Sequence, residues 1–149
     1  MTMLGLVSLL AAAVQPAPPS VRENCFSLET PQGIVIVDRI LLVFFESGSA
    51  RIQGPAPALL DGYAERYDAL PHCYLYIAGH ADTAGTSAAN LELSRRRADA
   101  VAAYLRSRGV VAPARVEAFG EARPLIETPD GVAEPQNRRV EIYVDEPPR

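Results

Sequence analysis

The sequence has no tryptophan and no lysine, and it has only 2 cysteines and 2 histidines in 149 residues. All 14 basic residues are therefore arginines, and the net charge is −4. A negatively charged chain of this kind is unlike a basic nucleic-acid-binding protein. The few cysteines and histidines are scattered, and their spacing is not typical of a zinc site.

The sequence also lacks an apolar run of the ~20 residues that a membrane-spanning helix needs. Its longest apolar run, Met3–Val14, has the length of the apolar region of a signal peptide, and Ala11–Ala13 offers a small-residue cleavage site. No basic residue precedes Arg22, so an N-terminal anchor is the alternative. We expect residues 1–20 to comprise a signal peptide and the proline-rich start of the mature chain, and we expect export.

Export changes what the two cysteines can do. An oxidising compartment permits a disulfide between Cys25 and Cys73, and the even number of cysteines fits one bridge. Closing a loop of ~48 residues would stabilise the fold by ~4 kcal/mol on the chain-entropy account. The alternative is two unpaired core thiols. We favour the bridge, because it would hold the start of the mature chain in place.

Strand and helix patterns alternate along the rest of the chain, and the length favours one domain. The expected elements are a strand at 33–45 with a break at 38–39, a helix at 55–70, a strand at 72–79, a helix at 88–108, and strands at 115–120 and 138–144. The strands alternate polar and apolar residues, which predicts an α/β (α+β) sandwich with both helices on one face of the sheet. The last two strands are expected to run antiparallel.

The helix at 88–108 follows a glycine-containing loop, with Thr86 or Ser87 as its N-cap and Gly109 just beyond its end. Helical spacing predicts one buried stripe on this helix. Its members are Leu91, Ala98, Val101, Ala102 and Leu105.

The stretch "GHADTAGTSAANLELSRRRADAV" concentrates the charged and polar residues of the chain. A metal site at His80 and Asp82 lacks a third ligand, and the sequence has no G-x-S-x-G motif for a serine nucleophile. A carboxylate pair of Asp82 with Glu92 or Glu121 would be held ionised by neighbouring arginines, which does not suit a general acid. We therefore do not expect an enzyme.

The same stretch suits a charged ligand better. Asn90 and Arg97 are seven residues apart and share one stripe of the helix, which places Arg97 at the rim of the buried face. Asp82 comes from the loop at the N-terminal end of that helix, where backbone N–H groups favour an anion. A carboxylate and a guanidinium together suit a zwitterion. An internal Asp82–Arg97 salt bridge fits the spacing equally well.

Three blocks in this order resemble the OmpA-like C-terminal domain family, which includes the domains of peptidoglycan-associated lipoprotein and of the flagellar stator protein MotB. They are Gly-x-x-Asp-x-x-Gly-Thr from Gly79, Asn-x-x-Leu-Ser-x-x-Arg-Ala from Asn90, and Asn-Arg-Arg-Val-Glu from Asn137. The resemblance covers Ile40–Val144. It implies a βαβαββ fold with a mixed sheet and no cofactor. It divides the chain into an extension or strand at 21–39, a peptidoglycan-binding domain at 40–145 and a tail at 146–149.

The resemblance further implies non-covalent binding of peptidoglycan through the diaminopimelate of its stem peptide. Asp82 matches the residue that takes the ligand's ammonium group, Arg97 the residue that takes its carboxylate, and Asn90 the residue between them. The implied contributors to the rest of the site are Thr83, Gly85, and one of Arg138 and Arg139.

One segment departs from the family pattern. Where relatives often have "FDFDSA", this chain has "FFESGSA", with Glu46 and Ser47 at the acidic positions. Cys25 does not follow the pattern of a lipoprotein anchor, so we expect a periplasmic domain, free or associated with the outer membrane or cell wall. The alternative function is a protein-interaction module that has the fold but does not bind the wall, with envelope proteins as partners. Retention of both Asp82 and Arg97 favours wall binding.

Overall fold

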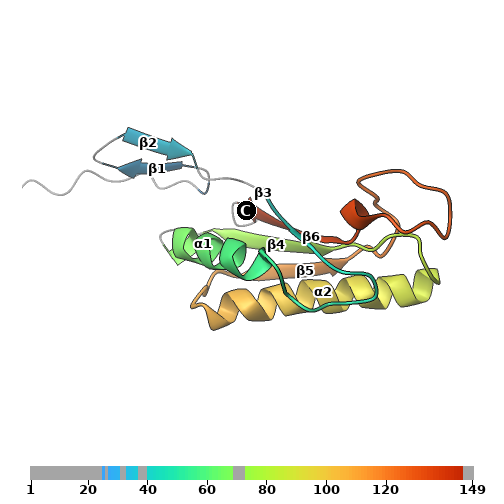
Figure 1. Ribbon diagram of the computed structural model, residues 1–149. Helices are drawn as coiled ribbons and strands as arrows, with labels where there is room; N and C mark the ends of the chain where they lie inside the picture. The colour runs from blue at the N-terminus through green and yellow to red at the C-terminus, as the bar shows by residue number, and fades with distance from the viewer. Residues whose placement is uncertain (1–24, 26, 31–32, 37–39, 69–72, 146–149) are drawn as a thin grey trace, which may run out of the picture.

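The computed structural model describes residues 25, 27–30, 33–36, 40–68 and 73–145. The expected signal segment at 1–20 and tail at 146–149 lie outside these ranges. The described residues form a four-stranded sheet, two α-helices and a short two-stranded hairpin near the N-terminus, and Figure 1 shows their arrangement. The elements in order are β1 (Ser27–Thr30), β2 (Gly33–Ile36), β3 (Ile40–Phe44), α1 (Ala56–Asp68), β4 (Tyr74–Gly79), α2 (Ser87–Ser107), β5 (Ala114–Ala118), the 3₁₀ helix η1 (Pro135–Asn137) and β6 (Arg139–Asp145).

The four-stranded sheet has the order β3-β6-β4-β5. Strand β6 runs antiparallel to both β3 and β4, whereas β4 and β5 are parallel. As expected, β5 and β6 run in opposite directions, but they are not neighbours, because β4 lies between them. The reason is the crossover through α2, which places β5 beside one edge of β4 and leaves the other edge for β6.

Both helices cover the same face of the sheet, as the alternating strands predicted. The inward-facing strand residues are buried together with apolar residues of both helices in one core. The core includes Val43, Leu75, Ile77, Val140 and Ile142 from the strands, and Leu60, Tyr63, Ala98, Val101 and Leu105 from the helices. The mixed two-layer fold is confirmed.

Helix α2 begins at the expected N-cap, where the side chain of Thr86 accepts a hydrogen bond from the backbone N–H of Ala89 at 3.2 Å. Its buried stripe differs from the expected one, because Leu91 is 47% exposed. The N-terminal half of the buried face consists of polar residues that contact loops: Asn90, Ser94 and Arg97. The apolar periodicity therefore predicted the C-terminal half correctly and the N-terminal half incorrectly.

Strand β4 and helix α2 approach each other closely at Gly79. A Cβ atom on this glycine would overlap the carbonyl oxygen of Ser94 and lie 3.2 Å from the Cβ of Ala98. The hydroxyl of Ser94 also accepts a hydrogen bond from the backbone N–H of Gly120 at 2.9 Å. These contacts fix α2 against the ends of β4 and β5, where the candidate site lies.

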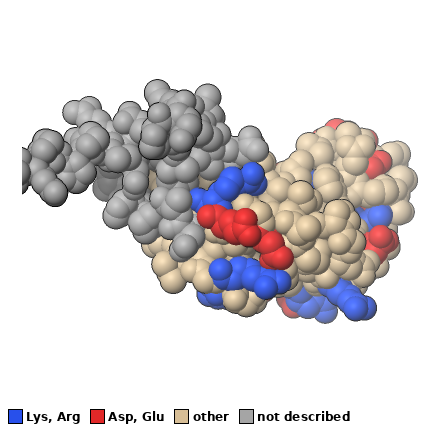
Figure 2. Space-filling view, turned by 60° about the vertical axis from the view of Figure 1, so that its left-hand side comes forward, with Lys and Arg blue, Asp and Glu red and all other residues tan. Residues whose placement is uncertain are grey.

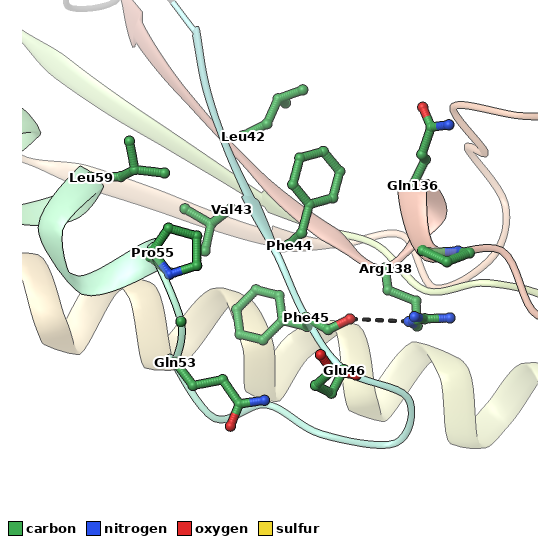
Figure 3. A pocket seen from close by; sticks show the side chains of 13 residues that line it. Leu42, Val43, Phe44, Phe45, Glu46, Gln53, Pro55, Leu59, Gln136 and Arg138 are labelled. Carbon is green, nitrogen blue, oxygen red and sulfur yellow. Dashed lines mark hydrogen bonds between the residues drawn. The ribbon is translucent and has the colours of Figure 1, made fainter.

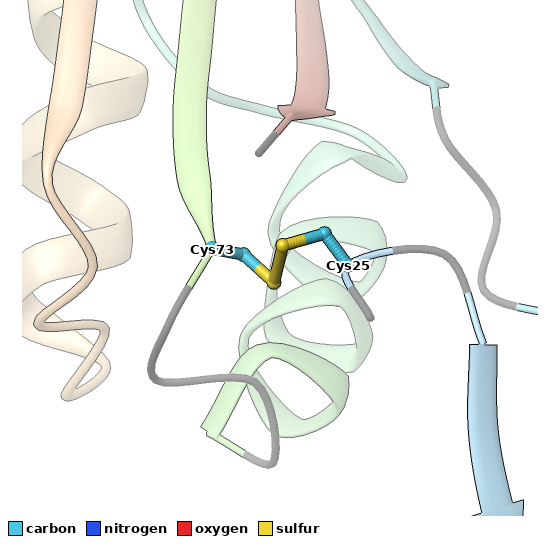
Figure 4. The surroundings of a disulfide bond; sticks show 2 residues. All are labelled: Cys25 and Cys73. Carbon is cyan, nitrogen blue, oxygen red and sulfur yellow. A yellow bond between two sulfur atoms is a disulfide. The ribbon is translucent and has the colours of Figure 1, made fainter. Parts of the chain in front are cut away.

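Cys25 and Cys73 form a disulfide, which confirms the favoured interpretation of the two cysteines. Their Cα atoms are 5.4 Å apart, and both residues are buried. Figure 4 shows that the bond links the segment before β1 to the start of β4, close to α1. The bridge therefore attaches the N-terminal segment to the four-stranded domain.

Candidate functional site

Asp82 lies in the loop that follows β4, and its carboxylate is buried. The loop is held by two backbone hydrogen bonds, from His80 N–H to the carbonyl of Arg139 at 2.9 Å and from Ala81 N–H to the carbonyl of Gly120 at 2.8 Å. One carboxylate oxygen of Asp82 accepts hydrogen bonds from Arg138 Nη1 and from the backbone N–H of Glu134, both at 3.2 Å. The described partners of Asp82 thus come from the segment between β5 and β6, just before β6 begins.

Arg97 is completely buried in the middle of α2, not at a rim as its position on the stripe predicted. The pattern could not show this, because the covering loop follows β3 and lies about 50 residues away in sequence. The guanidinium donates to the carbonyl of Ser49 at 2.8 Å, of Glu46 at 2.9 Å and of His80 at 3.0 Å. It also lies 5.4 Å from the centroid of the Phe45 ring.

The charge of Arg97 is maintained in this buried position. Burial lowers the pKa of Arg97 to about 10, with nearby Arg138 acting in the same direction and Asp82 in the opposite one. The guanidinium is therefore protonated at neutral pH. Three of its five N–H groups are used by the three carbonyls, which leaves two N–H groups for a ligand.

Asn90 lies near the start of α2 and contacts Glu121, not Asp82. Its amide donates to the Glu121 carboxylate at 2.6 Å, and the Ser87 hydroxyl donates to the same carboxylate. These two hydrogen bonds lower the pKa of Glu121, with Ser87 the larger cause. The neighbouring arginines invoked from the sequence are not the cause. Asn90 also adjoins Gly85, since a Cβ there would lie 3.8 Å from its side-chain oxygen.

Thr83 is hydrogen-bonded to the long loop between β5 and β6. Its hydroxyl lies 3.0 Å from the carbonyl of Pro129 and accepts a hydrogen bond from the N–H of Val132 at 3.2 Å. The carbonyl of Thr83 accepts from the N–H of Gly131 at 3.1 Å. Thr83 therefore forms the wall of the site indirectly, by holding the loop that carries Glu134.

The two adjacent arginines before and in β6 point to different places. Arg138 donates through Nε to the carbonyl of Phe45 at 3.0 Å (Figure 3) and through Nη1 to Asp82. Arg139 instead donates to Glu141 at 2.7 Å and lies close to His80. Because their side chains make different contacts, only Arg138 belongs to the Asp82 cluster.

A groove that the sequence did not predict adjoins this cluster. It has a volume of about 560 Å³ and lies along β3, the start of α1 and η1 (Figure 3). We call it the β3 groove; its apolar walls are Leu42, Phe44, Pro55 and Leu59, and Glu46 and Arg138 line it as well. The only signal for this groove in the sequence is Phe44, an aromatic residue next to Phe45 in the strand pattern. In the structure Phe45 points inward, whereas Phe44 points outward and is 49% exposed.

The described part of the chain includes neither a metal site nor a membrane-spanning helix. Within it, no group of three His, Cys, Asp or Glu residues could hold a metal ion. The same ranges include no helix that is long and apolar enough to cross a membrane. The face shown in Figure 2 carries acidic and basic side chains next to one another and no broad basic surface.

The chain is similar in sequence to peptidoglycan-associated lipoproteins of other bacteria. A peptidoglycan-associated lipoprotein from Rhizobium meliloti is 39% identical over 98 residues, which cover 65% of this chain and 56% of the relative. The corresponding protein from Pasteurella multocida is 35% identical and covers 65% of each chain. This chain thus spans less than two thirds of the length of these relatives. Their names agree with the expected location in the cell envelope.

Solved structures show the same fold. The crystal structure of the peptidoglycan-associated lipoprotein from Burkholderia pseudomallei superimposes with a TM-score of 0.65 at 31% identity, over 72% of this chain and 91% of that one. The C-terminal domain of MotB from Helicobacter pylori has a TM-score of 0.62 at 23% identity, over 71% of this chain and 84% of that one, and supports the fold alone. The sequence model of the OmpA family matches residues 44–138. The chain therefore belongs to the OmpA family.

Proposed function

We propose that residues 40–145 form a domain that binds peptidoglycan non-covalently, in the periplasm, through the diaminopimelate of the stem peptide. The relatives named for their association with peptidoglycan support the wall as the ligand. The observation that carries the proposal is the cluster of Asp82, Arg97 and Arg138 where the loops after β3 and β4 meet β6. Opposite charges at one place suit the zwitterionic end of diaminopimelate.

Binding at this cluster requires an exchange of partners. In this structure Arg138 occupies the Asp82 carboxylate, and the carbonyls of Glu46 and Ser49 cover the guanidinium of Arg97. A ligand ammonium group replaces Arg138 on Asp82, and the ligand carboxylate reaches Arg97 when the loop at Glu46–Ser49 moves outward. Gly48, in that loop, has a φ of 64°, a conformation that costs glycine little.

The direct test is co-sedimentation of the chain with two purified walls. One wall carries diaminopimelate in its stem peptide, and the other carries lysine, which lacks the second carboxylate. We expect the chain to sediment with the first wall and at least ~10-fold less with the second, because the contact of Arg97 with a carboxylate is lost. Equal binding to both walls would exclude recognition of diaminopimelate.

Single substitutions test the residues. Asp82→Asn and Arg97→Gln should each weaken binding ~10-fold or more, because each leaves one ligand charge without its partner. Arg96→Gln is the matched control, since Arg96 is the exposed neighbour of Arg97 on the same helix. Because Arg97 is buried, thermal unfolding of each variant must show that it is folded. If both site variants bind the wall as strongly as the wild type does, the cluster is not the binding site.

We propose a binding role and no catalytic one. Among the described residues, the ring nitrogens of His80 make no short hydrogen bond to the side chain of a serine, threonine or cysteine, so no nucleophile and base are paired at this histidine. The second candidate function, a protein-interaction module for envelope proteins, is favoured by the β3 groove with its exposed Phe44 and Leu59. Failure of the chain to bind either wall would make this candidate the leading one.

A further inference from the structure

The face of the sheet opposite the helices carries a second hollow, separate from the Asp82 cluster. Its volume is about 760 Å³, and it lies across β4, β6 and the segment after β5. We call it the open-face pocket. The residues that the argument uses are Tyr76, His80, Phe119, Arg123, Arg139 and Tyr143.

Buried polar atoms without partners line this pocket. His80 is 2% exposed and Arg139 is 3% exposed. Nη1 of Arg139 has no hydrogen-bond partner among the described residues, and the ring nitrogens of His80 make no short hydrogen bond there, although Nε2 lies 3.8 Å from a carboxylate oxygen of Glu141 and the backbone of Arg123 lies near the ring. Leaving a buried polar group unpaired is destabilising, so such groups generally have a partner. A ligand that completes these contacts needs an acceptor for the arginine and a group that can donate to or accept from the imidazole.

The charges around the pocket balance. Arg123 and Arg139 are offset by Glu141 and Asp145. Burial is the largest cause that lowers the pKa of His80 to about 4, and the positive charge of Arg139 is the next, so His80 is neutral at pH 7. The formal charges of the lining therefore give no net preference for an anion or for a cation. Hydroxyl and amide groups, which carry no charge and between them donate and accept, fit the unpaired atoms.

Aromatic rings form the walls of the pocket and are held in place. The ring centroids of Tyr76 and Tyr143 are 6.0 Å apart, and their hydroxyls donate to the carboxylates of Glu117 and Glu141. The Phe119 ring stacks on His80 with a centroid distance of 5.5 Å. Fixed rings beside a few polar groups are typical of sites that bind a ligand with one apolar face and a polar rim. A sugar ring has this character, with C–H groups on its faces and hydroxyls at its edge.

We propose that the open-face pocket binds carbohydrate, and specifically the N-acetylated glycan strand of the wall. The choice of wall glycan rests on the proposed function, whereas the choice of a neutral carbohydrate rests on the pocket. The dipeptide Arg138–Arg139 connects the two sites, since Arg138 contacts Asp82 and Arg139 lines the pocket. Stem peptide and glycan thus bind at two places on one domain.

The test uses glycan strands from which an amidase has removed every stem peptide. We expect these strands, added to the ¹⁵N-labelled chain, to shift the amide signals of residues lining the pocket and to leave those of α2 unchanged. Tyr143→Ala should weaken this binding about tenfold, the usual cost of removing a central aromatic contact. Tyr104→Ala is the matched control, because Tyr104 lies on α2, away from the pocket, and its hydroxyl donates to Asp61 of α1.

The outcomes separate this proposal from the proposed function. If the Asp82→Asn variant binds peptide-free glycan as well as the parent does, the pocket is an independent site and the proposal is supported. This conclusion holds even if the intact wall does not bind at Asp82. Absence of signal shifts at the pocket overturns the proposal, whether or not Tyr143→Ala folds. Concentration-dependent dimerisation of the parent through this face also overturns it, because a second copy is then the occupant.

Discussion

The carboxylate of Asp82 accepts a hydrogen bond from Arg138 at 3.2 Å, while the guanidinium of Arg97 donates to three backbone carbonyls. The spacing of the sequence left open an internal Asp82–Arg97 salt bridge. The described ion pairs assign Asp82 to Arg138 instead, with side chains only 7% and 12% exposed. Arg138 therefore balances the Asp82 charge in this structure.

Arg138→Gln should lower the free energy of unfolding by about 1–3 kcal/mol. Removing one partner leaves the Asp82 charge buried, although the N–H of Glu134 continues to donate to it. Urea unfolding measures the change, and Arg96→Gln is the exposed control. The double variant with Asp82→Asn should recover part of the loss; strictly additive effects would mean that the two side chains do not interact.

Gly79→Ala should destabilise the domain by about 3 kcal/mol or more, since the new methyl group overlaps the carbonyl oxygen of Ser94 and forces β4 and α2 apart. Gly62→Ala is the matched control. It lies in α1, where a methyl group would meet no atom within 4 Å, so the higher helix propensity of alanine should stabilise the domain by ~0.5–1 kcal/mol. Chemical denaturation of both variants measures the two changes in the free energy of unfolding, which should have opposite signs. Equal changes would contradict the close approach of β4 and α2 at Gly79.

Reduction of the disulfide should lower the free energy of unfolding by ~4 kcal/mol, because the bond closes a loop with a sequence separation of 48 residues. Thermal unfolding with and without a reductant measures this. The variant with both Cys25→Ala and Cys73→Ala should match the reduced parent and be insensitive to reductant. A reductant effect that persists in this variant would show that the loss has another origin.

His80 should make the domain less stable in mild acid. Its folded pKa of about 4 lies below its ordinary value near 6.5, so between these pH values the unfolded chain binds a proton that the folded chain does not. Its contribution to stability is complete above pH 6.5 and falls by roughly 2–3 kcal/mol as the pH drops to 4.

The measurement is unfolding by urea at several pH values, together with NMR titration of the imidazole signals. His80→Gln should flatten the stability profile between pH 6.5 and 4. An imidazole of His80 that titrates near 6.5 in the folded chain would contradict the expectation.

Local signals in the sequence were sufficient for most of the fold. The N-cap at Thr86, the glycine after α2 and the alternation in β6 depend on near neighbours, and the structure agrees with all three. Strand β1 was not predicted, because Ser27–Thr30 has a single apolar residue and gains its partner only through β2.

The geometry of the site depended on contacts that no local pattern records. Arg97 is buried because Glu46 and Ser49 fold over it, and Asp82 finds its partner 56 residues away. Leu91 was assigned to the core from its spacing, yet Asn90 takes the inward position and hydrogen-bonds to Glu121. At this end of the helix, the polar residues that hydrogen-bond to a loop are buried, and the position predicted from apolar periodicity is exposed.

The position of β6 between β3 and β4 also sets the order in which the chain can fold. A chain that emerges N-terminus first, from a ribosome or a membrane pore, has β3, β4 and β5 available before the strand that joins β3 to the others. The sheet is completed only when the last strand arrives, so the closing step forms contacts of high sequence separation. The sheet therefore remains incomplete until β6 has emerged, however early β3, β4 and β5 become available.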